Sequence, residues 1–255
     1  MFTTLESPAE PTAVGVDLGS AGTRIWASGC GTVHVTNPAV PVARGSGPVV
    51  RGRITNPDSM RVLLSGLLND PRRAFPPGAV VVACRPVGGD PRAEPALREV
   101  MTTVFAPQRL LLIDTVRAAA IGSGVAPGPL LIADVGAHLT EVAVLARGAT
   151  VAAHRRDVGL HDRTGGTDPD APIVAAVSDL IGQVRRSRHR PETVAAAVRA
   201  GLLLVGGGAS RPGLGARIAG AAGIAVRRPP APQLTAVRGA GLAALAAMRR
   251  GALRP

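Results

Sequence analysis

The chain has 255 residues, 46% of them hydrophobic, and a formal net charge of +12 at pH 7. This length can bury the core of one large domain or of two smaller ones. No apolar run approaches the roughly 18 residues that a membrane-spanning helix needs, and the N-terminal segment lacks the basic and apolar regions of a secretory signal. Cys30 and Cys84 are too few for a disulfide framework. These features predict a globular α/β protein of the cytoplasm.

The positive charge comes entirely from arginine, since the sequence contains no lysine. A Walker-type phosphate loop is therefore excluded, because it requires a lysine after its glycines. One interpretation of the arginine excess is the codon usage of a GC-rich genome, and the other is an anionic partner. With three phenylalanines, one tryptophan and no tyrosine to stack on bases, the composition favours an anionic membrane surface over nucleic acid.

Residues 1–12 are expected to form a disordered lead, and the first ordered element is a strand–turn–strand over Ala13–Ile25. An apolar strand runs into Asp17, and a second strand leaves through Thr23. The turn between them consists of Gly19, Ser20, Ala21 and Gly22. Such a turn directs several backbone N–H groups at one point, and a carboxylate at its edge can hold a hydrated cation. The stretch therefore suits a metal-bound polyphosphate.

The first half continues as an alternation of strands and helices. Asn56 and Pro57 predict the start of its first helix, because asparagine caps helix N-termini and proline is favoured in the first turn. The predicted elements are, in order, a strand over 31–36, a loop over 37–52, this helix, a strand over 79–84, a helix through 97–105, a strand over 109–113 and a helix over 115–125.

The second half repeats this order. Leu130–Leu145 has the same apolar run into Asp134, with Gly136 two residues later and Thr140 six residues later. Hairpins beside strand–helix alternation indicate a mixed sheet covered by helices, and two copies leave a cleft for a ligand. The elements predicted after the second hairpin are a strand over 149–154, a loop over 159–172, helices over 173–184 and 192–199, a strand over 201–205, a turn at 206–208, a helix over 214–221, a strand over 224–226 and a last helix over 234–249.

Five motifs in this order resemble the superfamily of actin, sugar kinases and heat-shock-chaperone ATPases, and within it the bacterial actins of the MreB and Mbl type. The motifs are the first phosphate loop (Val16–Thr23), the connecting helix (Ala118–Gly124), the second phosphate loop (134–144), the adenosine motif (Leu203–Leu214) and the closing helix (Thr235–Leu242). The resemblance implies a duplicated actin-like (RNase H-like) fold of two mixed-sheet domains, with the small subdomains reduced to loops. It places actin-like domain I at 13–126, actin-like domain II at 127–232, and a C-terminal helix over 233–255 at their junction.

The resemblance also implies a site for ATP and Mg²⁺, in which Asp17 and Asp134 hold the metal through water. The residues expected to bind the nucleotide are Asp17, Gly19, Ser20, Ala21, Gly22, Thr23, Gly136, Ala137, His138, Gly206, Gly207 and Gly208. The candidate catalytic residues are Asp114, Thr115, Thr140 and Glu141. Two departures from the family imply weak or absent hydrolysis. Thr115 stands where the relatives have the glutamate that positions the attacking water, and His138 stands where they have a glycine.

The leading hypothesis is a shortened MreB-like scaffold protein of cell shape or cell-wall morphogenesis. Its expected partners are a full-length actin-like homologue or cell-wall synthesis proteins, with peripheral contact to an anionic membrane at its inner face. One alternative is a small-molecule kinase of the same fold, for which Asp58, Asp90 and Asp114 are the candidate carboxylates. The other is a basic nucleic-acid-binding protein, a hypothesis that rests on charge alone.

Overall fold

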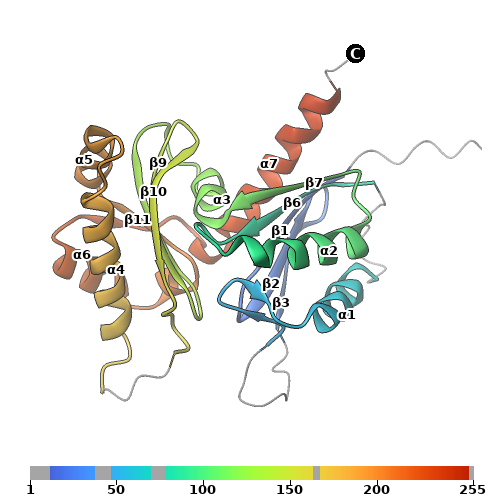
Figure 1. The fold of residues 1–255 in the computed structure, drawn as a ribbon, viewed down its shortest axis with the longest axis horizontal. Coiled ribbons are helices and arrows are strands. Elements are labelled where there is room, and N and C mark those ends of the chain that lie inside the picture. The colour runs from blue at the N-terminus through green and yellow to red at the C-terminus, as the bar shows by residue number, and fades with distance from the viewer. Residues whose placement is uncertain (1–11, 38–46, 70–77, 163–166, 253–255) are drawn as a thin grey trace, which may run out of the picture.

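The computed structural model describes residues 12–37, 47–69, 78–162 and 167–252. Most of the predicted N-terminal lead lies outside the described residues, as do the central parts of the two predicted loops, 38–46 and 163–166. The described chain forms two five-stranded mixed sheets with helices packed against them (Figure 1). The predicted α/β class and its duplicated arrangement are therefore confirmed.

The first sheet has the strand order β3-β2-β1-β6-β7. Its first three strands form an antiparallel meander, whereas β6 and β7 run parallel to β1 and are reached through helices. The strands are β1 (Ala13–Leu18), β2 (Gly22–Ala27), β3 (Gly31–Thr36), β6 (Val80–Arg85) and β7 (Arg109–Asp114). The helices of this half are α1 (Pro57–Leu68), α2 (Glu94–Phe105) and α3 (Thr115–Gly122). Asn56 caps α1 as predicted, since its side chain accepts a hydrogen bond from the N–H of Ser59 at 2.9 Å.

The second sheet repeats the first with the order β10-β9-β8-β11-β12. Its strands are β8 (Leu130–Val135), β9 (Thr140–Ala146), β10 (Ala149–Arg156), β11 (Leu202–Val205) and β12 (Val226–Arg227). The helices of this half are α4 (Ala171–Arg185), α5 (Pro191–Arg199) and α6 (Leu214–Ala222), and α7 (Thr235–Ala252) follows. Because β8 takes the place of β1 and β9 the place of β2, residues of the two hairpins can be compared one by one.

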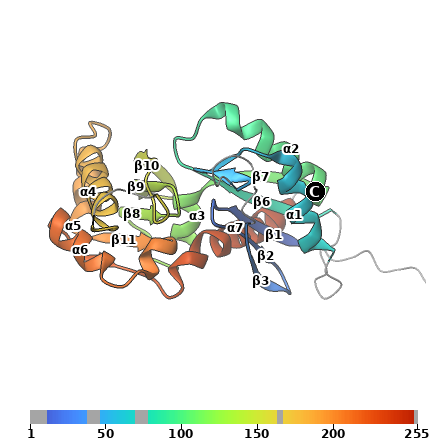
Figure 2. The same ribbon diagram turned by 90° about the horizontal axis from the view of Figure 1, so that it is seen from below.

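In the described chain, buried apolar side chains form three cores between the helices and the sheets. Side chains of α1 and α2, such as Met60 and Met101, pack on the outer face of the first sheet. Side chains of α4, α5 and α6, such as Leu180, pack on the outer face of the second sheet. The middle core contains α3, α7 and the inward faces of both sheets, and Figure 2 shows the two helices between the sheets. Both faces of β6 are buried, which explains its uninterrupted apolar run.

The helices α3 and α7 cross with backbone against backbone. A Cβ added to Gly239 of α7 would lie 1.7 Å from the carbonyl oxygen of Ala118, and one added to Gly122 of α3 would lie 1.9 Å from that of Thr235. The helix α7 approaches β1 in the same way, because a Cβ on Gly15 would lie 2.3 Å from the backbone nitrogen of Gly241. Glycine at these positions therefore sets the distance between α7 and the first sheet.

The structure differs from the predicted elements at several places. The segment 37–52, predicted as a loop, ends in a small hairpin of β4 (Val49–Val50) and β5 (Arg53–Ile54), which is too short to leave an alternating pattern. The helix α3 ends at Gly122 rather than at residue 125, and β12 begins at Val226 rather than at residue 224. No helix in the described part of the chain is long and apolar enough to cross a membrane.

Candidate functional site

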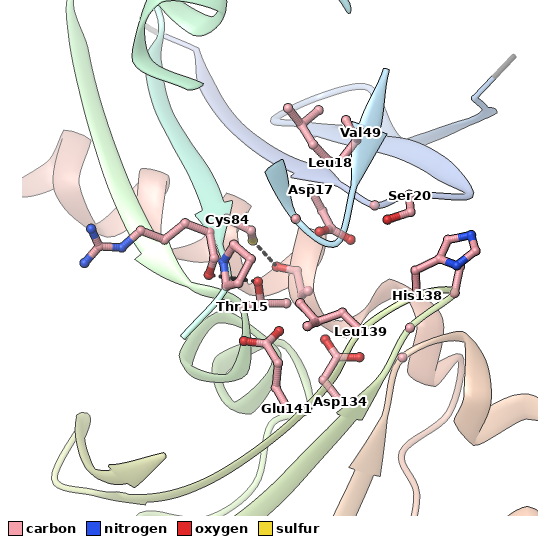
Figure 3. A pocket seen from close by; sticks show the side chains of 18 of the residues that line it. Asp17, Leu18, Ser20, Val49, Cys84, Thr115, Asp134, His138, Leu139 and Glu141 are labelled. Carbon is pink, nitrogen blue, oxygen red and sulfur yellow. Dashed lines mark hydrogen bonds between the residues drawn. The ribbon is translucent and has the colours of Figure 1, made fainter. Parts of the chain in front are cut away.

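A cavity of about 500 Å³ lies where the two hairpins meet, and residues of both sheets line it. Figure 3 shows that the carboxylates of Asp17 and Asp134 approach it from opposite sides. The expected site residues that line it are Asp17, Gly19, Ser20, Ala21, Gly22, Asp114, Thr115, Asp134, Gly136, Ala137, His138, Glu141, Gly206 and Gly207. Most of the residues expected from the sequence are thus brought together.

The turn of the first hairpin is braced by Asn37. The side-chain amide of Asn37 donates a hydrogen bond to the carbonyl oxygen of Gly19 (2.7 Å), and its backbone N–H donates to that of Ala21 (3.1 Å). The N–H groups of Ser20 and Ala21 have no acceptor among the described residues. The turn therefore has occupied carbonyls and free N–H groups, an arrangement that suits an anion.

The turn of the second hairpin is braced in the same way by the segment after β10. The N–H of Leu160 donates to the carbonyl oxygen of Gly136 (3.0 Å), and that of His161 donates to the carbonyl oxygen of Ala137 (2.8 Å). Within the described chain, nothing accepts a hydrogen bond from the N–H groups of Ala137 and His138. Two turns with free N–H groups therefore line one cavity.

Three expected site residues lie outside the cavity lining. The buried hydroxyl of Thr23 donates to the side chain of Asn37 (2.8 Å), and that of Thr140 donates to the carbonyl oxygen of Val158 (2.8 Å). The two threonines thus hold the braces of the two turns. Gly208 is buried against Val135, which a Cβ at this position would meet at 2.4 Å.

The two hairpins differ in the residue that faces their aspartate. On β1 and β2, Asp17 is directly opposite Arg24, and Nη1 of Arg24 lies 3.6 Å from the carboxylate. On β8 and β9, Asp134 is directly opposite Glu141. Burial, together with the negative charge of Asp17, raises the pKa of Asp134 to about 7. One half of the cavity therefore contains a neutralised carboxylate and the other a pair of facing acids.

Glu141 is buried and connects β9 to the first half of the chain. Its carboxylate accepts a hydrogen bond of 2.5 Å from the backbone N–H of Val87, which follows β6. Burial and the nearby Asp134 raise the pKa of Glu141 well above its usual range. A buried carboxyl group with a high pKa is a common feature of functional sites.

At the start of α3, both candidate catalytic side chains are already engaged. Thr115 donates a hydrogen bond to the carbonyl oxygen of Arg85 (3.0 Å; Figure 3). Asp114 lies 3.3 Å from the guanidinium of Arg85 and accepts a hydrogen bond from Thr150 (3.4 Å). A water held here for attack would have to compete with these partners.

The cavity rim carries two histidines and an ion pair between the halves of the chain. Nδ1 of His138 lies 3.0 Å from the carboxylate of Asp162, and the ring of His138 meets that of His161 edge to face, with centroids 5.7 Å apart. Arg51, in the β4–β5 turn, donates to the carbonyl oxygen of Asp157 (2.8 Å) and lies 3.3 Å from Asp162. The segment that braces the second turn is thus tied to the first half.

The turn after β11 approaches the second hairpin closely. Gly206 has φ of 84°, and an added Cβ would lie 2.0 Å from the carboxylate of Asp134. Gly207 begins a short 3₁₀ helix (Gly207–Ser210) at the cavity wall. A glycine at position 206 is required both by this backbone conformation and by the space that Asp134 occupies.

Several cavity residues have no place in the sequence predictions. Among them are the charged or polar residues Arg24, Arg53, Arg85, Glu94 and His161. The signal for Arg24 is in the repeat, since it follows Asp17 by seven residues as Glu141 follows Asp134. Of the kinase candidates other than Asp114, Asp90 lines the cavity and Asp58 lies outside its lining, on α1.

The duplicated sheets and the shared cavity define an actin-like protein. The chain belongs to the MreB/Mbl family, because the family model described as MreB/Mbl protein matches residues 42–175, more than half of the 255 residues. No curated protein sequence matches the chain.

Solved structures show the same fold. The structure of MreB5 of Spiroplasma citri bound to ADP has a TM-score of 0.78 and 16% identity, covering 97% of this chain and 100% of that one. The structure of the same protein bound to AMPPNP has a TM-score of 0.76 and 16% identity, covering 96% and 100%. The ethanolamine utilization protein EutJ from Carboxydothermus hydrogenoformans has a TM-score of 0.60 and 21% identity, covering 91% and 89%.

The residues of the cavity fit a nucleotide better than they fit a metal at both aspartates. Free N–H groups on two turns suit phosphate oxygens, and carboxylate oxygens suit Mg²⁺. Beside Asp17, however, the guanidinium of Arg24 already supplies a positive charge. No group of three or more histidine, cysteine or acidic residues in the described chain is arranged to hold a metal. Asp134 is therefore the better placed of the two for a cation held through water.

Proposed function

We propose that this chain is a shortened actin-like scaffold protein of cell shape or cell-wall morphogenesis that binds ATP in the cavity. The observation that carries the proposal is the pair of braced turns, Gly19–Gly22 and Gly136–Leu139, whose residues line one cavity. The MreB5 structures that share the fold contain ADP and AMPPNP, which supports a nucleotide as the ligand.

In this proposal each part of the cavity has a separate role. The N–H groups of Ser20, Ala21, Ala137 and His138 hold phosphate oxygens from two sides. The turn at Gly206 offers backbone, free of side chains, against which a ribose and purine can lie. Asp134 orients a hydrated Mg²⁺, which, when bound, offsets the negative charge of the phosphates.

Hydrolysis is proposed to be weak or absent, so that the nucleotide has a structural role. The family position for a water-positioning carboxylate holds Thr115, whose hydroxyl is bound to the carbonyl of Arg85. The protein would then act as a structural component of an assembly rather than through ATP hydrolysis.

The proposed partners are a full-length actin-like homologue or cell-wall synthesis proteins. Proteins of this family generally self-associate as actin-like filaments, and the segments 37–52 and 159–172 of this chain stand where the resemblance places the small subdomains. We expect little nucleotide-dependent pelleting of this chain alone in a sedimentation assay, and co-pelleting with a full-length homologue. A cytoplasmic location with peripheral contact to an anionic membrane is the proposed setting, since each arginine near such a surface contributes about 1 kcal/mol.

The test is calorimetric titration of the protein with ATP and Mg²⁺, using a variant that fills the cavity. A Cβ on Gly207 would meet only the Leu160 side chain, at 3.8 Å, so Gly207→Phe should fold and place its ring in the cavity. The matched control is Gly220→Phe on α6, where a Cβ meets nothing within 4 Å. We expect binding by wild type and by the control and none by Gly207→Phe. Equal binding by all three would contradict the proposed site.

A further inference from the structure

Arg24 is a cavity residue that the two hairpins do not share. It lies on β2 directly opposite Asp17, and at the matching place on β9 the second hairpin has Glu141. Its side chain is only 18% exposed. The two hairpins therefore place a guanidinium on one wall of the cavity and a carboxyl group on the other.

The guanidinium of Arg24 lies beside the first turn. Its Nη1 would be 3.6 Å from a Cβ placed on Gly19, the first residue of the turn that contains Ser20 and Ala21. Its charge also reaches the opposite wall, where it lowers the pKa of Asp134 against the larger effect of burial. A positive charge and backbone N–H groups thus face the cavity together.

Some N–H donors of the Arg24 guanidinium lack hydrogen-bond acceptors among the described residues. In the described chain, its buried Nε has no hydrogen-bond partner, and Nη1 lies 3.6 Å from Asp17, beyond ordinary hydrogen-bond distance. An unpaired buried donor of this kind is costly. A planar fork of donors matches the oxygens of a phosphate group, so an entering phosphate can satisfy it.

We propose that Arg24 is a built-in cation of the nucleotide site, which contacts the phosphates and takes the place that a divalent metal would have beside Asp17. The proposal rests on the proposed nucleotide binding and adds to it. It assigns Asp17 to the positioning of Arg24 rather than to a metal, and it makes binding of a nucleoside di- or triphosphate only weakly dependent on Mg²⁺.

The test is titration with ADP and ATP in excess Mg²⁺ and in EDTA, beside thermal unfolding of each variant. For wild type we expect EDTA to weaken binding by less than about threefold. Arg24→Leu should bind about tenfold or more weakly in EDTA, the scale of one charge-assisted hydrogen bond. Mg²⁺ should restore its binding, because a hydrated cation can then supply the positive charge that Arg24 provides beside Asp17. Arg24→Lys keeps the positive charge but not the planar set of donors, so its affinity in EDTA should lie between those of wild type and Arg24→Leu.

Two further variants serve as controls for the loss of charge at Arg24. Asp17→Asn/Arg24→Leu leaves no unpaired charge at this place, and we expect it to bind weakly with and without Mg²⁺. Arg61→Leu removes an arginine of α1 that lies outside the cavity lining, and it should bind like wild type. Binding by wild type that requires Mg²⁺, with the same metal dependence in Arg24→Leu, would overturn the role of Arg24 while leaving the nucleotide site intact. Absence of binding by wild type in both conditions would overturn both proposals.

Discussion

Asp134 and Glu141 face each other across β8 and β9, so that two carboxyl groups share one wall of the cavity. The matching pair of the first hairpin, Asp17 and Arg24, has opposite charges. Like charges directly opposite each other destabilise an antiparallel pair. When both acids are ionised, their repulsion therefore destabilises the second hairpin, and a proton or a bound cation can remove this repulsion.

Stability without ligand should fall as this pair ionises. The pKa of Asp134 is raised to about 7 in the folded protein, against about 3.9 when unfolded. Since the folded state binds the proton more tightly, its contribution is full below about pH 4 and is lost as the pH rises to about 7. We expect a loss on the order of a few kcal/mol across this window, since each pKa unit corresponds to about 1.4 kcal/mol.

Urea unfolding at several pH values measures this effect. Asp134→Asn should flatten the slope within the window, whereas Asp179→Asn, on the outer helix α4, should leave it unchanged. Asp168, whose pKa is lowered to about 2 by Arg217, affects stability only below the window, as the pH falls. A wild-type stability that rises from pH 4 to pH 7 would contradict the assignment.

Gly206→Ala should damage both stability and ligand binding. A Cβ at this position would lie 2.0 Å from the Asp134 carboxylate, and the residue has φ of 84°, which alanine adopts only with strain. Gly213→Ala is the matched control, since Gly213 has φ of 76° but open space around it. We expect the control to lose about 1 kcal/mol and Gly206→Ala clearly more, with weaker nucleotide binding. Equal losses of stability in the two variants would mean that the Asp134 side chain moves away from the added methyl group at no energetic cost.

ATP hydrolysis should be slow or undetectable in a phosphate-release assay. Thr115 carries no charge to polarise a water and is bound to the carbonyl of Arg85. Losing one group that stabilises the transition state typically costs about 10²–10³ in rate. Thr115→Glu/His138→Gly should gain activity, whereas Thr103→Glu, on the exposed face of α2, should not. Wild-type turnover equal to that of a full-length relative would refute this prediction.

The crossing of α3 and α7 should tolerate no side chain. Gly239→Ala places a Cβ 1.7 Å from the carbonyl oxygen of Ala118, so the helices must separate, at a cost of about 3 kcal/mol or more. Gly220→Ala, on the exposed face of α6, should stabilise the protein by about 0.5–1 kcal/mol. Thermal unfolding of the two variants compares them directly. A Gly239→Ala protein as stable as wild type would show that the crossing can relax.

The order of the elements was predictable because each hairpin combines an apolar run, an aspartate and a glycine turn at fixed spacing. That repeat brought Asp17 and Asp134 to one cavity, as expected. The short β4–β5 hairpin was not predictable, because its two-residue strands have no period. Its turn depends on Arg51 and Gly52, which adopt φ of 51° and 73°.

Register and bracing could not be read from the sequence. Asp17 is opposite Arg24 because the turn closes with a hydrogen bond from the N–H of Gly19 to the carbonyl oxygen of Gly22. The sequence alone does not specify that hydrogen bond. Thr23 was expected to contact phosphate, yet its buried hydroxyl donates to the side chain of Asn37, the residue that directly follows β3. Such contacts arise from tertiary packing rather than from local pattern.

The placement of α7 has a consequence for how the protein is made. This helix covers β1, β2 and β6, so the inner face of the first sheet is completed by residues that follow the whole second sheet in the sequence. The N-terminal half therefore emerges with one apolar face only partly covered, and this face stays so until the segment 235–252 has been synthesised. Exposed faces of this kind favour aggregation, so chains that stop before Thr235 would be prone to aggregate rather than to fold as half-molecules.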